Sequence, residues 1–366
     1  MATRANARGT DLDRDLRFVR ELTDQRAARG KLRGKGEAGG GPPAKPPLLQ
    51  RVSRAVQLGV EELGGAHITP ALQARCDANG MRLEHLSPTI GTVIHTDTRE
   101  AALSDAKVGA IRALLLQRKV VFFRRVAWSR EQHLAFARRF GTLEVHPFAA
   151  PVSEEFPEVL RIASGRGRPG SENAWHSDVT WRTEPSLGSV LCMRGSPPAE
   201  GGDTLFSDSY AQFDALPAAL RARVAGMTAQ HDFRLFRNRL TAEGVPPPFL
   251  GDMTRAFPVA RHPVVRTHPE TGRQALYVNV AFTEAIDGLS GAESEQLLQR
   301  LYRQADVPEF QCRFRWEENS VAFWDNRACQ HYASSDFFPH ERTVERVTIC
   351  GDRPFFRPAP AAAAKL

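Results

Sequence analysis

The 366-residue chain has no run of about 18 consecutive apolar residues, which is the length that a membrane-spanning helix needs, and this argues against a membrane span. Its first residues, Met1–Arg4, lack the apolar core of a secretory signal, and the aspartates that soon follow are atypical of an organelle transit peptide. Cysteine is scarce as well. We therefore expect a cytoplasmic protein with reduced thiols, because its five cysteines are scattered and show no Cys-x-x-Cys spacing: Cys76, Cys192, Cys312, Cys329 and Cys350.

An excess of charge of one sign is also missing from most of the chain. The formal net charge is +7, but residues 1–54 hold 13 Lys or Arg against 6 Asp or Glu, and the remaining 36 basic and 36 acidic residues cancel. No basic stripe interleaved with aromatic side chains occurs in the neutral part. We therefore expect that nucleic acid is not a partner.

Glycine and proline concentrate in residues 38–47, which indicates a linker. Before it, residues 11–29 are compatible with a charged helix. We expect residues 1–80 to form an N-terminal extension that is largely disordered, because it lacks hydrophobic periodicity; a targeting segment and a docking arm are the alternatives. One domain, residues 81–357, and a short tail, residues 358–366, complete the predicted organisation.

The first part of the predicted domain alternates strand-like and helical segments. Strands are predicted over residues 82–86, 92–95 and 120–123, and helices over residues 105–117 and 130–140.

From Trp175 onward the apolar pattern changes to short strands separated by turns, over residues 188–193, 204–206, 263–267, 275–278, 310–316, 321–324 and 344–350. One helix interrupts them, with Ser290 and Glu293 spaced as a capping box. The pattern predicts a mainly β fold with flanking helices, either a barrel or a double-sheet jelly roll.

The segment with the clearest chemistry is Trp175–Asp178. His176 and Asp178 lie two residues apart, so on an extended strand both side chains point to the same face. His331 follows an apolar strand and is placed to reach the same point. Two histidines and one carboxylate form the facial triad of non-heme Fe(II) sites, which leaves positions open for a bidentate cosubstrate and O₂. A surface pair or a hydrogen-bonded histidine is the alternative for a His-x-Asp pair taken by itself.

Two arginines, Arg342 and Arg346, fall on one face of a predicted strand. A solvated strand face is one interpretation. If both point into the barrel, however, two fixed cations are costly to bury without anionic partners. Carboxylates and sulfonates are such partners, because guanidinium binds them through paired hydrogen bonds. The partner that we expect is therefore a small anionic molecule.

From about residue 81 to residue 356 the chain resembles the taurine dioxygenase family of Fe(II)/2-oxoglutarate-dependent enzymes. The resemblance is dense in five segments: Trp175–Trp181, Gly201–Phe206, His262–Pro269, Trp324–Ala333 and Arg342–Asp352. It implies a double-stranded β-helix (jelly-roll) core with helices that support one sheet, and it implies an oxidoreductase that incorporates O₂.

The resemblance also implies a role for particular residues. His176, Asp178 and His331 would ligate Fe(II). Arg342, eleven residues past His331 as in the family, would pair with the distal carboxylate of the cosubstrate 2-oxoglutarate. Thr204 would hydrogen-bond the same carboxylate. The implied reaction converts 2-oxoglutarate and O₂ into succinate and CO₂ while the substrate is oxidised.

Four positions match the residues that shape the substrate pocket of taurine dioxygenase: His146, Phe236, Phe282 and Arg346. The His/Arg pair suits a sulfonate or a sulfate, and the two rings suit a short alkyl chain. Ordinary core is the alternative for each ring.

Two positions depart from the family pattern. Ala149 stands where the family has a tyrosine, and Glu172, beside Asn173, stands where it has the asparagine that meets the taurine amine. We therefore expect another alkyl sulfonate or a sulfate ester in preference to taurine. The alternative is that Glu172 pairs with a substrate amine.

The sequence thus predicts hydroxylation of the carbon next to a sulfonate or sulfate ester, with release of sulfite or sulfate and an aldehyde. One alternative is the same chemistry on a carboxylate, such as an aryloxyacetate or an amino acid. Another is a non-catalytic metal-binding protein whose function resides in the N-terminal extension. We also expect a homo-oligomer, either a dimer or a tetramer.

Overall fold

The computed structural model describes residues 67–99, 103–147, 151–165, 173–195, 197, 199–242 and 244–358, all of which belong to one unit of the chain, residues 47–366. The predicted charged helix over residues 11–29 and the predicted linker over residues 38–47 lie outside the described residues, as do Ala149 and Glu172. None of the helices in the described part combines the length and the apolar content that crossing a bilayer requires.

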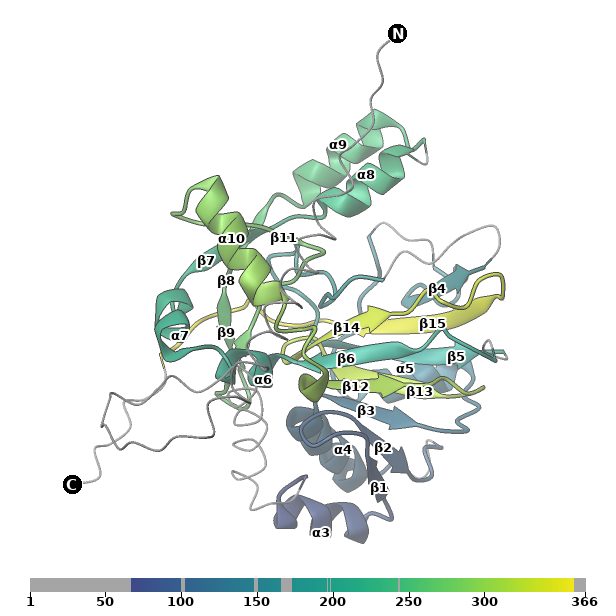
Figure 1. Cartoon of the computed structure of the whole chain (residues 1–366). Coiled ribbons are helices and arrows are strands. Elements are labelled where there is room, and N and C mark those ends of the chain that lie inside the picture. Colours follow the sequence, from purple (N-terminus) through teal and green to yellow (C-terminus); the bar gives the residue numbers. More distant parts are fainter. Residues whose placement is uncertain are drawn as a thin grey trace, which may run out of the picture. The chain divides into compact units, whose positions relative to one another are not determined.

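Two sheets lie in the centre of Figure 1. The larger has seven strands in the order β1 (Arg82–His85), β2 (Thr92–His95), β3 (Val120–Phe123), β13 (Val321–Asp325), β5 (Gly188–Arg194), β15 (Arg342–Ile349) and β4 (Val159–Ser164). Neighbouring strands are antiparallel, except that β2 and β3 run parallel. The smaller sheet has three antiparallel strands, in the order β12 (Gln311–Phe314), β6 (Thr204–Asp208) and β14 (Cys329–Ala333).

The strands of the larger sheet are apolar on both faces, and the smaller sheet packs against one of these faces. Val120 and Phe122 of β3 join the core between the sheets, whereas Val121 and Phe123 join the core on the outer face. Across the inner core, Phe122 stacks on Phe314 of β12 with ring centroids 4.0 Å apart. The inner face of the larger sheet is therefore the one that meets the smaller sheet.

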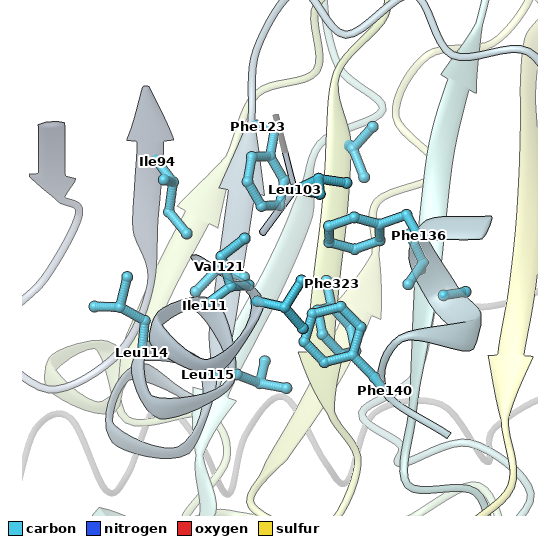
Figure 2. Close-up of a cluster of buried hydrophobic side chains, with 14 of the residues drawn as sticks. Ile94, Leu103, Ile111, Leu114, Leu115, Val121, Phe123, Phe136, Phe140 and Phe323 are labelled. Carbon is cyan, nitrogen blue, oxygen red and sulfur yellow. The ribbon is translucent and has the colours of Figure 1, made fainter. Parts of the chain in front are cut away.

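Two helices cover the outer face of the larger sheet, α4 (Asp105–Arg118) and α5 (Arg130–Arg138), and α3 (Pro70–Ala78) packs against α4. Figure 2 shows side chains of α4 and α5 packed against those of β2, β3 and β13. The sequence starts these helices with local signals, since Ser104 caps α4 and Ser129 forms a capping box at α5. Helix α3 lies within the stretch assigned to the N-terminal extension, and Leu72 and Cys76 on it are buried in this core.

The chain between β6 and β12 forms a separate group of elements, held by one apolar cluster that includes Leu276, Leu297 and Leu301 and, at α8 and α9, by another that includes Leu250 and Met253. It contains α6 (Ser209–Asp214), α7 (Ala218–Val224), β7 (Thr228–His231), α8 (Arg234–Ala242), α9 (Pro247–Ala256), β8 (Ala260–Pro263), β9 (Val265–Thr267), β10 (Gln274–Leu276), β11 (Thr283–Ile286), α10 (Gly291–Tyr302) and a 3₁₀ turn (Pro308–Phe310). Strands β11, β7 and β8 make one small sheet, and β9 and β10 make another.

The prediction of a mainly β fold with flanking helices is confirmed, and so is the capping box at Ser290 and Glu293. The prediction of one strand over residues 263–267 is wrong. At Val264 the chain changes partner, because β8 pairs with β7 whereas β9 pairs with β10. Strand β14, which carries His331, was not predicted.

The buried histidine of α5 leads to a prediction about acid stability. His133 is fully buried, and its Nε2 lies 3.0 Å from the carbonyl oxygen of Val190. Burial lowers the pKa of His133 from 6.5 to about 4, although the hydrogen bond to Val190 opposes the shift. As the pH falls from 6.5 to 4, the unfolded chain binds a proton that the folded protein does not. The free energy of unfolding therefore falls over this window, by up to roughly 3 kcal/mol from this site.

The change that tests this is His133→Gln, which keeps a donor near the Val190 carbonyl but does not titrate. In denaturant titrations, the slope of the unfolding free energy against pH between 6.5 and 4 is expected to be shallower than in the wild type. The exposed His340→Gln serves as the control and should keep the wild-type slope. A wild-type slope in His133→Gln would contradict the prediction.

Candidate functional site

His176 and His331 face each other across a short stretch of backbone pairing. His331 is the central residue of β14, and its N–H donates to the His176 carbonyl at 2.7 Å while the His176 N–H donates to the His331 carbonyl at 3.0 Å. Residues opposed in this way project their side chains on the same side. The two imidazole ring centroids accordingly lie 4.1 Å apart.

Asp178 lies in the turn that follows His176, beside Val179, whose φ is 49°. Its Oδ1 lies 3.9 Å from Nε2 of His176 and 3.8 Å from Nε2 of His331. All three residues are buried, and one nitrogen or oxygen atom from each lies within 4.8 Å of the other two.

The geometry of these atoms fits a single ion. Ligand atoms about 2.1 Å from one metal ion lie about 3.0 Å apart when they are at right angles, so side-chain rotations that shorten the histidine–carboxylate distances of 3.9 and 3.8 Å by roughly 1 Å bring the three atoms onto one ion. Two imidazoles and one carboxylate are also a donor set that transition metals accept. The structure therefore brings together the three residues that the sequence singled out.

The hydrogen bonds around these residues decide which atoms remain for a metal. Nδ1 of His176 donates to the carbonyl of Ala174 at 2.8 Å, which leaves Nε2 as the ligand nitrogen. Oδ2 of Asp178 accepts from Ser189 Oγ at 3.0 Å and from Asn326 Nδ2 at 3.4 Å. Oδ1 is thus the carboxylate oxygen that faces both histidines.

Asn326 is itself held in one orientation. Its Oδ1 accepts from Trp324 Nε1 at 2.8 Å and from the Asp178 N–H at 3.2 Å, and its Nδ2 donates to Ser186 Oγ at 2.8 Å. Sequence reasoning assigned no role to Asn326 or to Ser189. Asn326 lies within a segment that carries the family resemblance, but Ser189 lies in an apolar strand and offers no signal.

Arg346 contacts the same carboxylate. Its Nη1 donates to Asp178 Oδ1 at 2.8 Å. Burial by itself raises the pKa of Asp178, but the guanidinium of Arg346 and the nearby histidines outweigh burial and hold this pKa well below its usual range. Burial lowers the pKa of His331 to about 3, and the neighbouring His176 acts in the same direction. A carboxylate beside a neutral imidazole is the protonation state that metal ligation requires.

Arg342 and Thr204 meet between the two sheets. Nη2 of Arg342 lies 3.4 Å from Thr204 Oγ1, which also accepts from Trp316 Nε1 at 3.0 Å. Arg342 and Arg346 flank Val344, which packs in the inner core, so the same face of β15 carries both arginines. The structure thus brings together the two residues that the resemblance assigns to one carboxylate of the cosubstrate. Sequence reasoning did not single out Trp316.

His146 lies close to two arginines. Burial lowers the pKa of His146 to about 4, and the cations of Arg346 and Arg182 act in the same direction. Arg182 forms an ion pair of 2.5 Å with the buried Glu144, and the Glu144 N–H donates to the Thr348 carbonyl of β15 at 2.9 Å. The Arg182–Glu144 pair was not predicted, because no motif signals a pairing between residues that far apart.

The two predicted pocket phenylalanines pack against the same apolar cluster, which includes Val179 and Trp181. Phe282 lies edge-on to His176, with ring centroids 6.2 Å apart, so it lies beside the candidate metal ligands. Phe236 of α8 is half-buried on the same cluster.

Comparisons with known proteins agree with these features. The model of the family described as taurine catabolism dioxygenase TauD, TfdA family matches residues 82–348. The chain is 34% identical to the α-ketoglutarate-dependent sulfate ester dioxygenase of Pseudomonas putida, over 72% of this chain and 88% of that protein. It is also 34% identical to the (S)-phenoxypropionate/α-ketoglutarate dioxygenase of Sphingobium herbicidovorans, over 73% of this chain and 94% of that protein. The crystal structure of a taurine dioxygenase from Burkholderia xenovorans matches with a TM-score of 0.64 at 36% identity, covering 75% of this chain and 93% of that chain.

Proposed function

This chain belongs to the taurine catabolism dioxygenase (TauD, TfdA) family of α-ketoglutarate-dependent oxidoreductases, and from that membership we propose that it uses Fe(II) to hydroxylate the carbon next to a sulfonate or sulfate ester. The observation that carries the proposal is the convergence of His176, Asp178 and His331, with Oδ1 of the carboxylate facing both imidazoles. This donor set is the one that non-heme Fe(II) oxygenases use. Iron held there would supply the oxidation of 2-oxoglutarate to succinate and CO₂ by O₂, coupled to hydroxylation of a substrate C–H bond.

Arg342 and Thr204 bind the distal carboxylate of 2-oxoglutarate in this proposal. Both side chains are buried between the sheets and lie within reach of each other, so a carboxylate bound there would meet the guanidinium and the hydroxyl together. A carboxylate matches the guanidinium geometry through paired hydrogen bonds, and the Thr204 hydroxyl, already fixed by Trp316, offers one more. These contacts orient the cosubstrate so that its keto-acid end points toward the histidines.

Arg346 and His146 bind the anionic end of the substrate. In the described part of the chain, the buried Nε of Arg346 has no hydrogen-bond partner. A buried donor without a partner is rare in proteins, so this nitrogen fits an anion supplied by a ligand. His146 is neutral at neutral pH and can still donate a hydrogen bond to a sulfonate oxygen.

The apolar part of the substrate lies against Phe282, which is beside His176. The proposed products follow from hydroxylation at the carbon next to sulfur or next to the ester oxygen. A 1-hydroxysulfonate splits into an aldehyde and sulfite, and a 1-hydroxyalkyl sulfate splits into an aldehyde and sulfate. One relative is named for sulfate esters and one structural neighbour for taurine, which supports sulfur as the centre of the anion.

A carboxylate substrate is the second candidate. The relative from Sphingobium herbicidovorans is named for phenoxypropionate, and its identity to this chain equals that of the sulfate ester enzyme. A guanidinium binds carboxylates as well as sulfonates, so Arg346 does not by itself distinguish the two.

The facing sheets also support a finer description of the fold. We propose that they form a double-stranded β-helix, since a taurine dioxygenase structure matches three quarters of the chain at a TM-score of 0.64. The metal ligands and both arginines then lie at or between the two sheets.

A substrate panel tests the proposed reaction. We expect sulfite or sulfate release, in equal amounts with succinate, from at least one alkyl sulfonate or alkyl sulfate in the presence of Fe(II), 2-oxoglutarate and O₂. If every sulfur compound fails while an aryloxyalkanoate or an amino acid yields succinate, the second candidate replaces the first.

Arg346→Gln tests the assignment of the substrate anion. Loss of its charged hydrogen bonds is expected to raise the KM for the sulfur substrate roughly 10- to 100-fold, while the KM for the cosubstrate changes little. Steady-state succinate formation measures both constants. Arg161→Gln, which changes an exposed arginine of β4, is the matched control. If Arg346→Gln raised the KM for the cosubstrate more than the KM for the sulfur substrate, the roles assigned to Arg346 and Arg342 would be exchanged.

A further inference from the structure

The two oxygens of the Asp178 carboxylate have different surroundings. Oδ2 is held by Ser189 and Asn326, as described above. Oδ1 faces Nε2 of His176 and of His331, and the same oxygen accepts the hydrogen bond of 2.8 Å from Nη1 of Arg346. The oxygen that is placed to ligate a metal is therefore also the counter-ion of the substrate arginine.

A dication and a guanidinium on one oxygen oppose each other. The guanidinium draws electron density from Oδ1 and repels a second positive charge at short range, so its presence weakens the carboxylate as a metal ligand. This effect disappears when the guanidinium acquires an anion of its own. Ser189 and Asn326 keep the carboxylate in place in either case, because they hold the other oxygen.

Arg346 is able to change its partner. Its side chain is 14% exposed, and its buried Nε has no acceptor among the residues that the structure describes. An anion that bound through Nε and one terminal nitrogen would use the paired geometry that guanidinium prefers. Binding in this way competes with the single bond from Nη1 to Asp178.

We propose that Arg346 couples the anion site to the metal site: a substrate anion that pairs with Arg346 relieves Asp178 Oδ1 and thereby tightens metal binding. By thermodynamic linkage, the metal tightens binding of the anion by the same factor. The inference rests on the proposed function, since it needs a metal on the triad and an anion on Arg346. It gives Arg346 a second role, as a positioning residue for the metal ligand, in addition to substrate recognition.

The test measures metal binding and needs no turnover. Mn(II) is titrated into the full chain without 2-oxoglutarate, and free Mn(II) is followed by electron paramagnetic resonance with and without saturating 1-propanesulfonate. The neutral 1-propanesulfonamide is the matched ligand control. In the wild type, propanesulfonate is expected to lower the Kd of Mn(II) at least about fivefold, whereas the sulfonamide leaves it unchanged.

Variants separate the coupling from a direct effect of the sulfonate on the ion. Arg346→Gln removes the charge, so it is expected to bind Mn(II) at least about fivefold more tightly than the wild type. Propanesulfonate should leave the Kd of Mn(II) for this variant unchanged. Arg346→Lys keeps the charge and should restore the weaker binding of Mn(II), at least in part. Arg161→Gln, on β4, should behave as the wild type does.

The outcomes bear on the two proposals differently. If the wild type binds Mn(II) with no response to propanesulfonate, the coupling is overturned while the proposed function stands. It is also overturned if Arg346→Gln still responds, because the sulfonate then acts on the ion directly. If the wild type does not bind Mn(II) at all, the metal site of the proposed function fails and the coupling fails with it. Should Arg346→Gln not fold, the comparison of wild type with Arg346→Lys and the two ligands decides the question.

Discussion

Asp178→Asn is expected to lower metal affinity by more than about a hundredfold and to reduce succinate formation to background. The loss of a ligand should exceed the 10- to 100-fold cost typical of residues that only support a ligand. The substitution also leaves the guanidinium of Arg346 next to the site without its carboxylate partner, so the site gains net positive charge where the ion must bind. The shape of the side chain is retained, and Ser189 can still hydrogen-bond the amide oxygen.

Mn(II) binding by electron paramagnetic resonance and succinate formation with Fe(II) measure the two losses. Asp97→Asn is the matched control, because Asp97 is an exposed carboxylate that pairs with Arg99 on the surface. This control should retain the metal affinity and turnover of the wild type. An Asp178→Asn protein that is folded by circular dichroism and binds Mn(II) as tightly as the wild type would contradict the assignment of the ligand.

Arg342→Met is expected to raise the KM for the cosubstrate, 2-oxoglutarate, roughly 30- to 4,000-fold. Truncating one partner of a buried, hydrogen-bonded charge pair costs about 2–5 kcal/mol, and every 1.4 kcal/mol corresponds to a factor of ten. The Thr204 hydroxyl alone cannot replace the guanidinium, since it carries no charge. Because Arg342 is distant from the proposed substrate anion along β15, the KM for the substrate should change much less.

Succinate formation measured against 2-oxoglutarate concentration, at saturating substrate, gives the effect. Arg342→Lys should recover only part of the loss, because lysine supplies charge without the planar pair of donors. Arg161→Met on β4 controls for the loss of an exposed arginine. An unchanged KM for the cosubstrate in Arg342→Met would remove this residue from the cosubstrate site.

The elements that local patterns determine were predicted well. Strands β3 and β13 are short apolar runs with polar or turn residues at their ends, and they occupy the centre of the larger sheet. Helix α10 begins at a capping box, which is a signal contained within four residues. Such features need no knowledge of distant parts of the chain.

Strand β14 was not predicted because its residues do not form an apolar pattern. Gln330 and His331 interrupt the apolar pattern, yet both are buried. Gln330 is tolerated there because its amide donates to Gln212 and to the carbonyl of Val278, both remote in sequence. Partners of this kind are created by the tertiary fold, so periodicity in the strand does not reveal them.

The candidate site likewise combines features that local patterns predict with features that only the tertiary fold creates. The spacing of His176 and Asp178 pointed to a shared target, and the apolar strand before His331 placed that residue at the same point. The family resemblance added the roles of Arg342 and Thr204. The identity of the ligand atoms, however, depends on Ser189 and Asn326, which select Oδ1 of the carboxylate. The contact of Arg346 with that same oxygen depends on the alignment of β15 against a distant turn, and no motif in the sequence predicts it.

The central claim is that His176, Asp178 and His331 hold one iron ion that 2-oxoglutarate chelates. Anaerobic addition of Fe(II) and then 2-oxoglutarate to the full chain, followed by visible absorption, tests it most directly. We predict a weak metal-to-ligand charge-transfer band in the wild type that is absent in Asp178→Asn. A wild-type protein that is loaded with Fe(II) and 2-oxoglutarate but shows no such band would contradict the account.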